Sequence, residues 1–161
     1  MVDIIERITA FIVSVLIMIF GIPSNFDPVE KNPVNVETEN IEIISNNYGI
    51  NTSGKYVFDN SAGFGVYYLT INQSNEMREY AESLGEDFFE ENNLIIVDVT
   101  LSDTAEKAFV SSVTENGDTL NLQYYTKDVA DIGCCVICYD SICIKTSKQI
   151  TKVNAIEIPA I

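Results

Sequence analysis

The chain has 161 residues, enough for one domain of ordinary size and too few for two comfortable ones. Its 47% hydrophobic and 20% charged residues are typical of a globular protein and exclude a wholly disordered or collagen-like chain. Nine basic residues stand against 24 acidic ones, a formal net charge of −15, which excludes nucleic acid as a main partner because phosphate is repelled. The sequence has no histidine, which excludes Ser-His-Asp and Cys-His catalysis and histidine-ligated metal sites.

An apolar run without any charge extends from Ile8 to Ile22. As a helix at about 1.5 Å per residue it would span roughly 22 Å, short of a hydrocarbon core of about 30 Å. This length is typical of the apolar region of a signal peptide, although the acidic flank and the lack of an A-x-A site are not. We expect residues 1–22 to form a hydrophobic helix that contacts the membrane as an export signal or uncleaved anchor. The alternative is a buried amphipathic helix, for which the run lacks a polar face.

Residues 23–40 have the composition of a spacer. They include Pro23, Pro28, Pro33, several asparagines and a run of acidic residues, with no apolar periodicity. Such a composition cannot bury enough surface to become ordered, so it predicts a flexible linker. A single β-rich globular domain is then expected over residues 41–161, outside the cytoplasm.

The first half of this domain is predicted to contain three strands and one helix. Short β-branched or aromatic runs indicate strands at Ile41–Ser45, Lys55–Phe58 and Gly65–Ile71. The helix follows, with an N-terminal cap at Ser74 or Asn75.

The stripe that identifies this helix consists of Met77, Tyr80, Ala81 and Leu84, at i, i+3, i+4 and i+7. Gly85 can end the helix in a left-handed conformation. The stripe is expected to pack on a sheet, with Phe88 and Phe89 following in a short turn.

The second half is richest in strand signals, with runs at Leu94–Thr100, Phe109–Glu115, Asp118–Tyr125, Ile142–Thr146 and Val153–Ile158. The first of them is long and mostly apolar, which indicates a central strand. Asn116-Gly117 predicts a hairpin with a type I′ turn, in which Val113 faces Leu120 and Ser111 faces Leu122. The predicted fold class is α+β, mainly antiparallel sheet with one principal helix packed on it.

Four cysteines, Cys134, Cys135, Cys138 and Cys143, lie within ten residues. A disulfide, free buried thiols, and a metal or redox site all remain open. If Asp140-Ser141 is a two-residue turn, Cys138 faces Cys143 across a hairpin, and these two form the candidate disulfide. Only Cys135 and Cys138 have C-x-x-C spacing, and no basic neighbour lowers a thiol pKa, so no metal or cofactor is predicted.

The predicted helix and the segment after it are strongly acidic, with Glu76, Glu79, Glu82, Glu86, Asp87, Glu90 and Glu91. The alternating Asp/Asn ladder of an EF-hand loop is missing, and no spacing selects a glycosidase pair. A solvated acidic face that keeps the protein soluble is expected.

The stretch Phe88–Val97 (FFEENNLIIV), the Asn116-Gly117 hairpin and the run Ile142–Lys145 together resemble small exported proteins and lipoproteins of unassigned role from Gram-positive bacteria. More distantly, from about Ser45 to Ile158, the chain is similar to the C-terminal domain of protease-complex accessory subunits (PrcB-like). It lacks the lipobox cysteine of the lipoproteins and differs from both groups in its cysteine cluster. The resemblance implies a β-rich, non-enzymatic domain outside the membrane and supplies no catalytic residue.

The function predicted from the sequence is a non-enzymatic binding or accessory module, exported or at the cell surface, with an unidentified protein partner. Contacts are expected through sheet edges or through aromatic residues, of which the candidates are Tyr48, Tyr67, Tyr68, Tyr124 and Tyr125. The alternative is a thiol-dependent redox or metal-binding protein centred on Cys134–Cys143.

Overall fold

The computed structural model describes residues 34–46, 54–70, 74–85, 87–131, 133–134 and 137–160. The predicted export helix and most of the predicted linker lie outside these residues. No helix in the described part of the chain is long and apolar enough to span a membrane.

Eight strands of the described residues form two four-stranded sheets. The outer sheet has the order β1-β5-β6-β8, with β1 (Val34–Asn35), β5 (Glu106–Asn116), β6 (Thr119–Asp128) and β8 (Lys152–Glu157). The central sheet has the order β2-β7-β4-β3, with β2 (Ile41–Asn46), β7 (Cys138–Ser147), β4 (Asn92–Leu101) and β3 (Lys55–Phe58). All neighbouring strands are antiparallel except β6 and β8.

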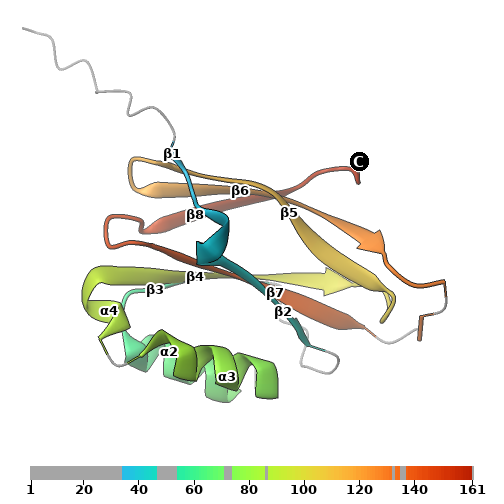
Figure 1. The fold of residues 1–161 in the computed structure, drawn as a ribbon, viewed down its shortest axis with the longest axis horizontal. Helices are drawn as coiled ribbons and strands as arrows, with labels where there is room; N and C mark the ends of the chain where they lie inside the picture. Colours follow the sequence, from blue (N-terminus) through green and yellow to red (C-terminus); the bar gives the residue numbers. More distant parts are fainter. Residues whose placement is uncertain are drawn as a thin grey trace, which may run out of the picture. The chain divides into compact units, whose positions relative to one another are not determined.

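The two sheets pack face to face, and helices cover the other face of the central sheet (Figure 1). The helices are α2 (Ser61–Thr70), α3 (Asn75–Leu84) and the short α4 (Phe88–Glu91), with the 3-10 helix η1 (Thr38–Asn40) before β2. The predicted α+β class with mostly antiparallel strands is confirmed. The expected single principal helix is wrong, because α2 and α3 have ten residues each.

The prediction of a central strand at Leu94–Thr100 is confirmed by β4. This strand lies between β7 and β3 and is buried on both faces from Asn93 to Val99. Two-sided burial explains its almost uninterrupted apolar sequence.

The predicted helix after Ser74 is confirmed as α3. The Ser74 hydroxyl oxygen accepts a hydrogen bond from the Met77 backbone N–H at 3.0 Å, which satisfies a donor of the first turn. Gly85 follows the helix with a φ of 78°. Met77 and Tyr80 are buried against the sheet, as the apolar stripe predicted.

The predicted strand at Gly65–Ile71 is wrong, because residues 65–70 belong to α2. Asn60 precedes the helix and its side-chain oxygen accepts the Gly63 N–H at 2.8 Å, so it acts as an N-cap. Phe64 and Tyr67, three residues apart, face the central sheet. Tertiary burial of this face outweighs the strand preference of the sequence.

The folded part begins earlier than Ile41. Val34 and Asn35 pair with Glu115 and Thr114 of β5 as strand β1, and the Val36 N–H donates to the Val113 carbonyl at 3.0 Å. Residues 34–40 of the predicted linker therefore belong to the fold. Their partner β5 lies some 80 residues away, so local composition gave no sign of this pairing.

The predicted hairpin is confirmed, but its turn and register differ from the prediction. The loop is Gly117-Asp118, and Asn116 pairs with Thr119. Gly117 has a φ of 63°, while no described residue other than glycine has a positive φ, so the turn has its glycine at the first position, as in type II′. Val113 therefore faces Leu122 instead of Leu120, and Ser111 lies at a register shift between Val110 and Ser112.

The predicted turn at Asp140-Ser141 is also wrong, because β7 runs unbroken from Cys138 to Ser147. Both residues are fully buried, and each finds a tertiary partner for its polar group. An Asp140 carboxylate oxygen accepts the Ala108 backbone N–H at 2.8 Å, and the Ser141 hydroxyl donates to Asp98 at 2.7 Å. These bonds allow a polar pair to occupy the middle of a strand.

Candidate functional site

The cysteines do not form a site in the described part of the chain. Cys138 and Cys143 are free thiols on one extended strand and belong to opposite cores. Five residues of strand span roughly 17 Å, whereas a disulfide needs Cα atoms within about 7 Å. The proposed Cys138–Cys143 pairing is therefore corrected. Cys134 is exposed, and Cys135 lies outside the described residues.

The two buried thiols are also poorly placed for redox chemistry. Burial raises the pKa of Cys143 well above its usual value and also raises the pKa of Cys138. A reactive thiol needs the opposite shift, because the thiolate is the nucleophile. In the described residues, no three Cys, Asp or Glu side chains are grouped so as to hold a metal ion.

A polar cluster that the sequence did not reveal lies between α2 and the central sheet. The Tyr67 hydroxyl lies 2.9 and 3.1 Å from the two Asp98 carboxylate oxygens, and the Ser141 hydroxyl donates to Asp98 at 2.7 Å. Burial raises the pKa of Asp98 to about 6, although these two hydrogen bonds oppose the shift.

This cluster holds the fold together and is poorly suited to catalysis. Asp98, Tyr67 and Ser141 are at most 5% exposed, so a substrate has no access to them. The pairing of β4 with β7 sets Asp98 beside Ser141, and the packing of α2 on the central sheet adds Tyr67. Asp98 is the one charged residue within a long apolar run, and this was the signal in the sequence that could have indicated a buried polar cluster.

A different feature is accessible, at the edge of the central sheet. One side of β2 pairs with β7, and no described strand pairs with its other side. A hollow of about 540 Å³ lies there, lined by Glu42–Ser45 of β2, by Glu76, Glu79, Tyr80 and Ser83 of α3, and by Lys107 of β5. We call it the edge hollow. Since consecutive strand residues point to opposite faces, a lining of four in a row means that the hollow follows the strand edge.

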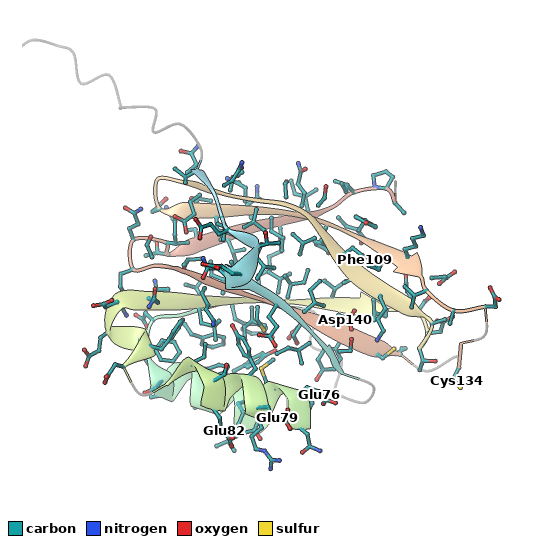
Figure 2. The ribbon with its side chains drawn as sticks, in the orientation of Figure 1. Glu76, Glu79, Glu82, Phe109, Cys134 and Asp140 are labelled. Carbon is teal, nitrogen blue, oxygen red and sulfur yellow. The ribbon has the colours of Figure 1, made fainter. Side chains whose placement is uncertain are left out.

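The edge hollow is acidic, and one residue that lines it has a buried hydroxyl without a partner among the described residues. Glu76 and Glu79 lie along α3 (Figure 2), and Glu42 of β2 faces the same helix. Tyr80 is only 3% exposed, and its hydroxyl has no hydrogen-bond partner among the described residues. Burial raises the pKa of Tyr80, with smaller contributions from Cys143 and Glu42, so the hydroxyl is neutral.

The only basic residue in that lining is already engaged. The Lys107 ammonium donates to the Ser45 hydroxyl at 3.0 Å and lies 3.8 Å from a buried Asp140 oxygen. It therefore does not neutralise the three glutamates of the edge hollow.

A second hollow borders the same strand on its other face. It has a volume of about 460 Å³ and is lined by Val36, Ile41, Ile43, Val110 and Val113 together with four uncharged polar residues. We call it the sandwich hollow, because it lies between β2 and the irregular part of β5. Ile43, which is 37% exposed, lines both hollows.

Other predicted contact residues are distributed differently. The described acidic residues of the α3–α4 region are all exposed. Tyr67 is core, Tyr68, Tyr124 and Tyr125 are half-buried, and Tyr48 lies outside the described residues. None of these tyrosines in the described part of the chain is fully exposed, so the sheet edge is the more accessible of the two predicted kinds of contact surface.

Comparison with known proteins found no matching family model, no matching curated protein and no matching solved structure. The resemblance to exported lipoproteins and PrcB-like domains stays a prediction.

Proposed function

We propose that this protein is a non-enzymatic binding module that takes up an extended segment of a partner protein along β2. The observation that carries the proposal is the pair of hollows on the two faces of one edge strand. Strand addition uses both features: backbone bonding to the edge provides affinity, and alternate side chains enter hollows on either side.

The other edges of the described sheets are less suited to this role. β1 has only two residues. β3 has only four residues, and the ammonium of Lys55 at its start donates to the Ala155 carbonyl of β8. β8 has six residues, as β2 does, and serves as the natural control.

Peptide selection with full-length protein in a mild detergent tests the proposal. A displayed library of random twelve-residue peptides is selected on the wild-type chain, and recovered peptides are titrated against two variants. Ile43→Lys places a charge on the β2 edge, and Ile156→Lys places the same charge on β8, where the isoleucine is 50% exposed. Melting temperatures establish that both variants are folded.

We expect peptides that bind wild type and Ile156→Lys equally and that bind Ile43→Lys at least about tenfold more weakly. Hydrogen exchange should show new protection at residues 41–46 when peptide is bound. Recovery of no binding peptide, or of peptides indifferent to Ile43→Lys, would contradict the proposal.

We further propose that the module acts outside the cytoplasm, supported by the uncharged run Ile8–Ile22. Residues 1–40 fused to alkaline phosphatase, which is active only after export, should give active enzyme in a bacterial host. A fusion beginning at residue 23 is the matched control and should be inactive. Equal activity of the two fusions would contradict export by this run.

A further inference from the structure

The chemistry of the two hollows specifies what kind of segment fits. A strand added to β2 would run along the six residues Ile41–Asn46, a length of roughly 20 Å. Its side chains would alternate between the helix side of the central sheet and the sandwich side. Each set of side chains would then meet one hollow.

On the helix side, the edge hollow favours cationic side chains. Glu42, Glu76 and Glu79 line it, and Lys107 is held by Ser45 and Asp140. Tyr80 also lines it, but its hydroxyl is fully buried, so the glutamates supply the contacts with a cation.

On the sandwich side, the opposite preference holds. No charged residue is among those that line the sandwich hollow, and five of them are valine or isoleucine. A charged side chain placed there would lose water without gaining a partner, so apolar side chains are favoured.

Other occupants of the edge fit less well. A second copy of this chain would bring its own Glu42 against the acidic hollow, and both copies carry a net charge of −15. A metal ion alone needs converging ligands, and no group of three such residues with that geometry occurs in the described part of the chain.

We infer that the partner is a protein segment in extended conformation whose basic residues alternate with apolar ones, the basic set meeting Glu42, Glu76 and Glu79 and the apolar set entering the sandwich hollow. This inference rests on the proposed function, since it names the partner of the same strand edge.

Three synthetic peptides of equal length test the alternation. The first is an acetylated, amidated octapeptide of alternating Lys and Val. The second has the same composition in two blocks, four Lys followed by four Val. The third alternates Glu and Val. Each is titrated against the full-length chain, and binding is measured by calorimetry at low and at moderate salt.

We expect the alternating Lys/Val peptide to bind at least about tenfold more tightly than either control, and its affinity to fall as salt increases. Equal affinity of the alternating and block peptides would overturn the inference, because net charge alone would then explain binding.

Two charge reversals on one helix locate the contact. Glu79→Lys changes a residue that lines the edge hollow, and Glu82→Lys makes the same change three residues further along α3, outside that lining (Figure 2). Both residues are exposed, so neither change should disturb folding. We expect the affinity for the alternating Lys/Val peptide to fall about tenfold in Glu79→Lys and less than about twofold in Glu82→Lys.

The outcomes separate this inference from the proposed function. If library peptides require Ile43 but contain no alternation of basic and apolar residues, the strand-edge function stands and the partner chemistry is wrong. If the alternating peptide binds with the same affinity to Ile43→Lys and Glu79→Lys as to wild type, it binds elsewhere, and the inference is overturned as well.

Discussion

The central sheet is covered on both faces, and the two coverings differ chemically. Towards the outer sheet it presents almost only aliphatic side chains, from Ile95, Val97, Val99, Leu101, Ile142 and Ile144. Towards the helices it contributes Ile44, Leu94, Ile96 and Cys143, which meet the aromatic side chains of α2 and α3. The helix face also contains the Asp98 cluster and the Tyr80 hydroxyl, which has no partner among the described residues.

Each face buries one aspartate, and the partners differ. Asp140, on the sandwich face, accepts a backbone N–H and lies near the Lys107 ammonium. Asp98, on the helix face, is bonded by the neutral hydroxyls of Tyr67 and Ser141, and burial raises its pKa. The helix face therefore carries a carboxyl, that of Asp98, whose pKa is raised by burial, and it borders the edge hollow through Tyr80.

The largest difference between the faces should appear at two adjacent residues of β7. Ile144 and Cys143 are both fully buried, the first in the sandwich core and the second under the helices. Ile144→Ala should destabilise the protein by roughly 2–5 kcal/mol because it leaves a cavity between two sheets. Cys143→Ala should lower the free energy of unfolding by only about 1 kcal/mol. Urea denaturation measures both, and equal losses would contradict the comparison.

The pH dependence of stability should be governed in part by Asp98. Its pKa is about 6 in the folded protein, against an ordinary value of 3.8. Because the pKa of Asp98 is raised in the folded protein, this residue contributes to the free energy of unfolding. The contribution is fully present below pH 3.8 and is lost as pH rises through about 6. A difference of about two pKa units between the folded and unfolded states corresponds to roughly 3 kcal/mol in the free energy of unfolding.

Asp98→Asn isolates this effect, since it removes the titration and keeps an oxygen acceptor. Between pH 4 and pH 7, the free energy of unfolding of Asp98→Asn should rise relative to wild type by that amount. Unfolding curves that run parallel over this pH range would show that Asp98 titrates normally.

A smaller effect is expected at Ser141. Its hydroxyl donates to Asp98 at 2.7 Å and lowers the pKa of that carboxyl. Ser141→Ala should cost about 1–2 kcal/mol at neutral pH and should move the Asp98 titration to higher pH. A loss of stability without any movement of the titration would indicate a packing effect alone.

The smallest change is expected at Tyr80. Since its hydroxyl is buried without a partner among the described residues, Tyr80→Phe should not lower the free energy of unfolding and should raise it by at most about 1 kcal/mol. A stability loss above about 1 kcal/mol would show that the hydroxyl is bonded in solution.

Local signals in the sequence were sufficient for α3, β4 and the existence of the hairpin. The Ser74 cap, the Met77–Leu84 stripe and the long apolar run of β4 each reflect a preference of nearby residues. The turn needed more than local preference, because Asn116-Gly117 permits type I′ and the structure instead has Gly117-Asp118 in the loop.

The candidate site was not predictable in this way. The sequence indicated a sheet edge as a contact surface but not which edge, and the acidic residues of α3 gave no sign that they face β2. The hollows depend on the placement of β2, α3 and β5, which are separated by tens of residues.

By itself, the sequence determined the acidic charge, the α+β class, and those elements whose residues prefer one conformation locally. Only the tertiary structure decided that strand-like residues 65–70 form a helix and that Asp140-Ser141 continues a strand. It also decided that no described strand pairs with the outer side of β2, which lies between two hollows. The physical reason is that each of these depends on distant partners: Asp98 for Tyr67 and Ser141, and the Ala108 N–H for Asp140.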